Sequence, residues 1–214
     1  MSVTKPTVNK TAEIDAGKDR RAELLAAAAE VFVAKGFHDA KVSDVVTAAG
    51  VAQGTFYLYF KTKADVLLQL VNDCCLDIIG ALAACSQVKA DCRDPKQLRE
   101  SNVAFLIDLF NLLENKHQAV KVVLSGQTGV DTAIDRALAE LKSVLVEISK
   151  ANLEAGMASG IIRKLDSTIV AEAVVGMIYH IAFERFVLGR RLGVSIRQLA
   201  EELVDFELDG IAAE

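Results

Sequence analysis

Residues 53–63 carry several side chains that can hydrogen-bond to a nucleic acid, and none of them is acidic. The amide of Gln53 can both donate to and accept from an adenine edge, and the methyl group of Thr55 can contact a thymine methyl. Gly54 has no side chain, so the backbone can approach a partner closely there. Hydroxyl and ammonium groups bond phosphate oxygens, which adds four candidate contacts: Tyr57, Tyr59, Lys61 and Lys63. Tyr59 has an alternative place in a small core with Phe56 and Phe60.

Two short helices are predicted to position these residues. Apolar spacing favours a helix over residues 42–49, Gly50 breaks it, and a third helix starts near Gln53. This is a helix-turn-helix arrangement, in which the second helix can enter a DNA major groove. Lys41 and Ser43 stand at the start of the 42–49 helix, where free backbone amides favour an anion, so they are further candidate phosphate contacts.

A longer helix is predicted before this pair. From Asp19 to Lys35, apolar residues recur at three- and four-residue spacing, and Gly36 ends the pattern. Residues 1–17 show no apolar periodicity and are predicted to form a flexible arm.

The remaining chain is also predicted to be helical. Helices are expected over about 63–85, 95–115, 116–124, 132–157 and 167–188, followed by a last one that starts after Ser195. Asp94, Asp166 and Ser195 are the expected N-caps. With about nine helices and no credible strand pair, the class is all-α.

The N-terminal segments resemble the tetracycline-repressor (TetR) family of transcriptional regulators. The resemblance rests on LLAAAAEVF (24–32), KGF (35–37) and DVVTAAGVAQGTFYLYFKTKADVL (44–67), in the order and at the spacing of that family. It implies a helix-turn-helix DNA-binding domain over residues 18–65 and a helical effector-binding and dimerisation domain over 66–214. Ala52 and Lys41 depart from the family pattern, which usually has Ser or Thr at these two helix caps.

A recognition helix of about seven residues is only about 10 Å long. Because so short a helix cannot give operator affinity alone, we expect a homodimer that places two of them on a palindromic operator. The segment 167–188 is apolar nearly all round, which predicts burial on two sides, one of them against the partner. Burial within one chain is the alternative. The expected interface residues are Val170, Val174, Ile181, Ile196, Leu199, Leu203 and Phe206.

The resemblance also implies that the C-terminal domain encloses a small effector, whose binding releases the DNA. An apolar or amphipathic compound fits the apolar composition of these helices best. Candidate pocket residues, each with plain core packing as its alternative, are Phe105, Leu109, Phe110, Met177, His180 and Phe183. We expect His180 to be buried and to need a hydrogen-bonding partner. Repression rather than activation is implied by the resemblance alone.

An enzyme is not expected. The three histidines are scattered over separate elements, and no nucleophile elbow, phosphate loop or metal-spaced cluster is present. No cofactor or metal is therefore predicted. Cys74, Cys75 and Cys85 are expected to be reduced and partly buried, although a redox-sensing thiol that gates DNA binding stays open, as does a helical interaction module without DNA binding.

The net charge of −5 is unevenly distributed along the chain. Residues 1–65 hold nine Lys or Arg and eight Asp or Glu, a net +1, and residues 66–214 hold fifteen and twenty-one, a net −6. DNA binding then depends on a few basic residues that share one surface. The longest run without a charge, Val45–Phe60, is shorter than a membrane span, and no signal peptide is read at the start, so a cytoplasmic location is expected.

Overall fold

The computed structural model describes residues 10–90, 94–124, 132–190 and 192–211. Within these ranges the chain forms nine helices and no strand, as predicted for an all-α protein. It divides into two compact units, Met1–Leu67 (unit 1) and Leu68–Glu214 (unit 2), close to the boundary predicted from the sequence.

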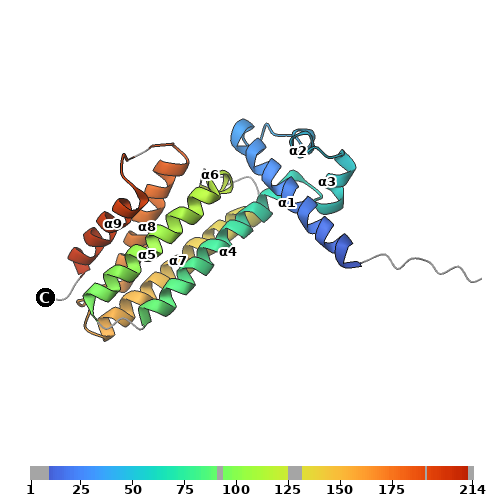
Figure 1. Cartoon of the computed structure of the whole chain (residues 1–214). Coiled ribbons are helices and arrows are strands. Elements are labelled where there is room, and N and C mark those ends of the chain that lie inside the picture. The colour runs from blue at the N-terminus through green and yellow to red at the C-terminus, as the bar shows by residue number, and fades with distance from the viewer. Residues whose placement is uncertain (1–9, 91–93, 125–131, 191, 212–214) are drawn as a thin grey trace, which may run out of the picture. The chain divides into compact units, whose positions relative to one another are not determined.

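Unit 1 contains α1 (Lys10–Lys35), α2 (Val42–Ala48) and α3 (Gln53–Tyr59), shown in blue to cyan in Figure 1. The start of α1 corrects the predicted arm, since the helix begins inside residues 1–17. Ala, Glu and Ile at 12–14 are compatible with a helix, and an established helix extends at little cost. Residues 1–9 lie outside the described residues.

The core of unit 1 includes fully buried side chains from all three helices, among them Leu24 of α1, Val45 of α2 and Phe56 of α3. The turns between the helices depend on Gly36 and Gly50, whose φ values of 79° and 66° lie in the left-handed region that disfavours other residues. These turns fix the direction in which α3 leaves α2.

Unit 2 contains α4 (Lys63–Ala90), α5 (Pro95–Asn115), α6 (His117–Leu124), α7 (Thr132–Ala158), α8 (Ser167–Phe186) and α9 (Ile196–Ile211). The first residues of α4 belong to unit 1, so one continuous helix runs through the boundary. Within unit 2, α7 packs on α8 and α5 packs on α9 (Figure 1). Arg99 of α5 reinforces the second pair through two bonds of 2.6 and 2.8 Å to the carboxylate of Asp205 in α9.

The predicted caps are confirmed. The carboxylate of Asp94 accepts from the amide of Gln97, and that of Asp166 accepts from two amides at the start of α8. The hydroxyl of Ser195 accepts from the amide of Gln198 at 3.1 Å. Each cap satisfies backbone donors that an α-helix leaves without an internal acceptor.

Among the described residues, two segments are long and apolar enough to cross a membrane by length and composition, Lys63–Ser86 and Ser167–Phe186. The core helices of soluble proteins can have the same length and composition. Charged side chains interrupt both segments, Asp73 in the first and Glu172 in the second. Of the apolar window in α8, 11% is buried, so this helix exposes apolar surface within a single chain.

Candidate nucleic-acid interface and ligand cavity

Helix α3 presents an uncharged face. Gln53, Gly54 and Tyr57 are exposed, and Thr55 and Tyr59 are half-buried. Phe56 is fully buried, and its ring meets the edge of the Tyr57 ring at a centroid distance of 5.4 Å. The buried phenyl ring thus anchors the helix, while Gln53 is exposed and Thr55 is half-buried.

Leu58 is a candidate that sequence reasoning missed, since its side chain is 79% exposed. It lies four residues after Gly54, so both stand on the same side of the helix. An exposed leucine on a surface without charge suits a thymine methyl in a major groove. The helical spacing from Gly54 was the signal that could have found it.

Lys63 does not take the predicted role. Its ammonium group donates to the carbonyl oxygens of Phe37 at 2.6 Å, His38 at 2.8 Å and Ala40 at 2.9 Å. It also lies 4.6 Å from the centre of the Phe37 ring. An ammonium group has three donors, so none remains for a phosphate. Lys63 therefore holds the start of α4 to the loop after α1.

The amino end of α4 is also occupied by the chain itself. The carboxylate of Asp65 accepts from the amides of Lys61 and Thr62 at 3.0 and 2.8 Å. A carboxylate at the amino end of a helix occupies the position where a phosphate would otherwise be favoured. The side chain of Lys61 stays exposed, and its ammonium group forms no ion pair within the described part of the chain. Lys61 thus remains a candidate phosphate contact.

At the start of α2, the N-cap residue Lys41 makes no side-chain cap, and the acidic side chain of Asp44, three residues later, bonds back to its amide. Asp44 accepts from the amide of Lys41 at 2.9 Å and from the ammonium of Lys35 at 2.7 Å. These hydrogen bonds, that from Lys35 first, lower the pKa of the Asp44 carboxyl below its usual 3.8. Lys41 and Ser43 are both exposed, so they remain available as predicted.

Unit 2 contains a cavity of about 660 Å³ lined by residues of α4 to α9. Of the predicted pocket residues, Phe105 and Leu109 line it. Phe110 is buried elsewhere in the core, and Met177, His180 and Phe183 do not line the cavity. Aliphatic side chains dominate the lining, and Asn102, which is 6% exposed, supplies an amide.

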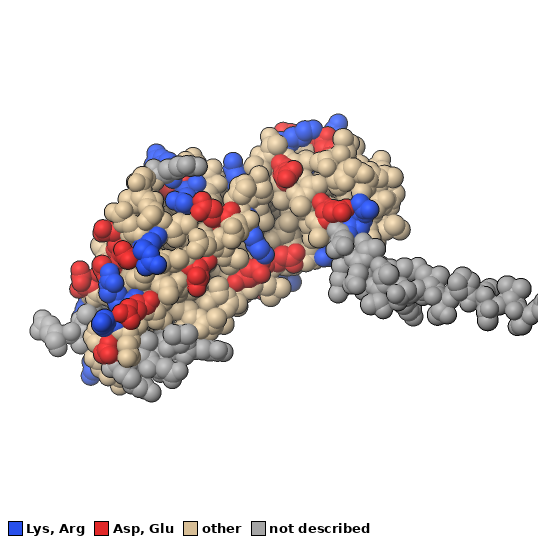
Figure 2. All heavy atoms as spheres, viewed as in Figure 1, with Lys and Arg blue, Asp and Glu red and all other residues tan. Residues whose placement is uncertain are grey.

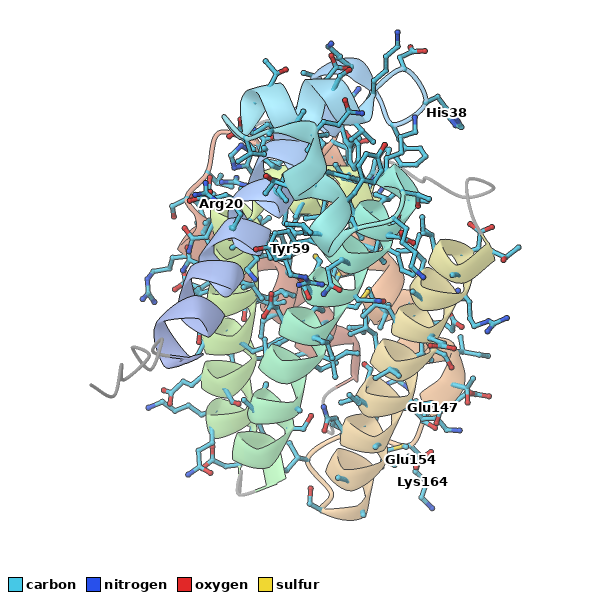
Figure 3. The ribbon with its side chains drawn as sticks, turned by 90° about the vertical axis from the view of Figure 1, so that its right-hand side faces the viewer. Arg20, His38, Tyr59, Glu147, Glu154 and Lys164 are labelled. Atoms are coloured by element: carbon cyan, nitrogen blue, oxygen red, sulfur yellow. The ribbon has the colours of Figure 1, made fainter. Side chains whose placement is uncertain are left out.

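The prediction that His180 is buried is wrong. It is exposed, on one helical stripe with Ile169 and Ala173. Because α8 is apolar on nearly all sides, its sequence does not indicate which side packs against the core. His38 projects from the loop between α1 and α2 into solvent (Figure 3). Among the described residues, no group of acidic, histidine and cysteine side chains could hold a metal ion.

The comparisons with known proteins agree with this geometry. The family model for bacterial regulatory proteins of the tetR family matches residues 24–70. The uncharacterized HTH-type transcriptional regulator YdgC of Bacillus subtilis is 29% identical over 91% of this chain and 94% of its own.

This chain belongs to the TetR family of transcriptional regulators.

Two solved structures share its fold. FadR from Bacillus subtilis in complex with stearoyl-CoA superposes with a TM-score of 0.71 and 23% identity, over 89% of this chain and 98% of FadR. The SmeT–triclosan complex superposes with a TM-score of 0.73 and 18% identity, over 92% and 93% of the two chains. As in its relatives, the function of this TetR-family chain is regulatory and not enzymatic.

The described cysteines of the TetR-family chain are buried, as predicted. Burial raises the pKa of the Cys74 thiol to about 12 and that of Cys75 to about 11. A redox-sensing thiol needs exposure and a low pKa instead. Cys92 lies outside the described residues.

The predicted dimer residues fall into several environments. Phe206 is 75% exposed, whereas Leu199 is 5% exposed in the single chain. Leu199 is therefore core, because α9 turns this residue inward where it packs on α5. Val170 packs against a buried cluster that includes Val146 and Ala171. The remaining four residues are half-buried: Ile181, Ile196, Leu203 and Val174. Val174 also lines the cavity.

Proposed function

We propose that this TetR-family regulator is a cytoplasmic repressor that binds a palindromic operator as a homodimer and is released by an apolar or amphipathic effector. The observation that carries the proposal is the course of α4. Three residues separate the end of α3 from the start of this helix, which lines the cavity with Cys74, Ile78 and Leu82. An effector in the cavity touches the helix that directly follows the DNA-reading helix.

The proposed DNA contacts follow the exposed groups of unit 1. Gln53, Thr55 and Leu58 would meet base edges, with Gly54 allowing close approach. Phosphates would be held by the exposed residues Lys41, Ser43, Tyr57 and Lys61 and by the half-buried Tyr59. Lys63 is not among them, because its donors are used within the chain.

The proposed dimer surface is the exposed stripe of α8 together with α9. Ile169, Tyr179 and Phe206 are large apolar residues left uncovered in one chain. The small residues Ala173 and Gly176 on the same side of α8 allow close helix approach. A second copy would cover this surface symmetrically, in an interface that repeats the same patch on both subunits. Figure 2 shows basic and acidic side chains interspersed on the visible face, without a single-sign patch.

Release requires an effector that binds more tightly to the conformation that does not fit the operator. The Lys116–Asp77 ion pair ties the junction between α5 and α6 to α4, so displacement of α4 by a ligand would act on this junction too. The FadR and SmeT structures contain stearoyl-CoA and triclosan respectively. The first ligand is amphipathic, with an apolar acyl chain and a charged head group, and the second is largely apolar.

A gel-shift titration with the DNA that flanks the gene tests the proposal. We expect a retarded complex with one dimer per palindrome, lost on addition of an apolar compound that raises the melting temperature of the free protein. If the protein binds no flanking DNA at low salt, the proposed function is contradicted, and a helical interaction module takes its place.

A further inference from the structure

Along α5, the cavity lining has one polar side chain, that of Asn102, and it stands at one end. On α5 the lining extends from Asn102 to Leu113, about 16 Å along the helix axis. The α6 end is bordered by Val120 and Val123, which offer no polar side chain. Asn102 lies at the other end of the α5 part of the lining, away from α6. An elongated molecule with one polar end fits this distribution.

Asn102 is a buried polar side chain without a partner. The residue is 6% exposed and lines the cavity, and its amide forms no hydrogen bond with any described residue. Its polar atoms are not among the buried unsatisfied atoms of the described residues, so they remain accessible from the cavity. The nearby amide of Asn152, in contrast, already donates to the hydroxyl of Ser86 at 3.1 Å. The donors and acceptor of Asn102 are therefore available to a ligand.

The charges around the cavity disfavour an anionic head group. Among the described lining residues, Lys142 is the one cation, and it lies 3.1 Å from the carboxylate of Glu172. Two further lining residues, Asp135 and Glu207, are acidic. A carboxylate buried beside Asn102 would lack a positive partner, and an unpaired buried charge is far more costly than a neutral group.

We propose that the cavity takes an elongated, uncharged molecule whose terminal hydroxyl or carboxamide bonds to Asn102 and whose hydrocarbon tail extends toward α6. This inference rests on the proposed function, because it specifies the effector of the same cavity. A carboxamide and Asn102 can each donate to and accept from the other, which satisfies both groups. The cavity volume of about 660 Å³ is within the usual range for one small ligand.

Isothermal titration calorimetry of the full-length protein at pH 8 tests this, with three ligands of equal chain length: dodecanamide, 1-dodecanol and dodecanoate. We expect the wild-type protein to bind the amide and the alcohol at least about tenfold more tightly than the carboxylate. Asn102→Leu should abolish this preference. Asn111→Leu, the same substitution at an exposed position of α5, should leave all three affinities unchanged.

Circular dichroism melting checks that each variant folds, and Asn102→Ala replaces Asn102→Leu if the latter does not. Equal or tighter binding of dodecanoate by the wild type, unchanged discrimination in the Asn102 variants, or no binding of any of the three ligands overturns the inference. The titrations contain no DNA. A protein that discriminates the head groups but fails to bind its flanking DNA would therefore contradict the proposed function alone.

Discussion

The ammonium group of Lys63 lies 2.6 Å from the carbonyl oxygen of Phe37 and 4.6 Å from the centre of its phenyl ring. This contact fixes the first turn of α4 to the loop that follows α1. Since α3 lies between these two points in the chain, its position depends on the same contact. The ammonium group of Lys63 thus stabilises the fold of unit 1. The positive charge that binds phosphates must come from other residues.

Two lysines that are two positions apart should therefore behave differently. Lys63→Met leaves three carbonyl groups without their donor, so we expect unfolding to become easier by about 1–3 kcal/mol. Lys61→Met should leave the melting temperature unchanged and weaken DNA binding. It should also reduce the salt slope, the steepness with which the logarithm of the binding constant falls with the logarithm of the salt concentration, by about one. Calorimetric melting and binding titrations at several salt concentrations separate the two effects. A normal melting temperature with a reduced salt slope in Lys63→Met would restore the phosphate role.

Asp44 makes the stability of unit 1 depend on pH. Its pKa is lowered in the folded protein, chiefly by the hydrogen bond from Lys35, so its contribution is present above the unfolded value near 3.8. That contribution disappears as the pH falls through the lower, folded pKa. We expect Asp44→Asn to melt earlier than the wild type at pH 7, with a difference that shrinks below pH 4. The exposed Asp39, changed to Asn, is the control. A difference that stays constant from pH 7 to pH 3 would argue against this account.

The buried cysteines should resist modification. With pKa values of about 12 and 11, Cys74 and Cys75 are less than about one part in a thousand thiolate at pH 8. In a Cys92→Ser background, we expect alkylation of the native protein to be at least about a hundredfold slower than that of the unfolded chain. DNA binding should survive mild oxidant. Rapid native labelling together with oxidant-induced release would favour thiol gating instead.

The proposed dimer can be broken without disturbing the subunit. Ala173 is exposed on the α8 stripe, so Ala173→Arg fits a single chain but places two charges in a symmetric interface. Light scattering after size exclusion should show a monomer with normal helicity. Ala151→Arg is the matched control, because Ala151 is exposed on α7 between Glu147 and Glu154, which lie along one side of that helix in Figure 3. A dimeric Ala173→Arg protein would place the interface elsewhere.

Features set by neighbouring residues could be predicted from the sequence. The caps at Asp94, Asp166 and Ser195 and the glycine turns depend on local geometry, and all are present. The same holds for the anchoring of α3 by the buried Phe56.

Features set by distant contacts could not be predicted. The carbonyl oxygens that accept from Lys63 lie more than twenty residues away in the sequence. A lysine in the sequence does not indicate which distant carbonyl groups it will bond. His180 and Leu199 were placed on the wrong sides of their helices, because apolar residues face both the core and a proposed partner. The hydrogen-bonding role of Asn102 depends on the cavity that surrounds it.

The exposed face of α3 should decide which DNA sequence is bound. Selection from random double-stranded oligonucleotides, followed by sequencing, measures this for the wild type and for Gln53→Ala, which changes an exposed side chain. Our account predicts a palindromic consensus for the wild type and loss of preference at one symmetric pair of positions in Gln53→Ala, with the rest retained. An identical consensus for both proteins, or no enrichment by the wild type, would contradict the assignment of α3 as the reading helix.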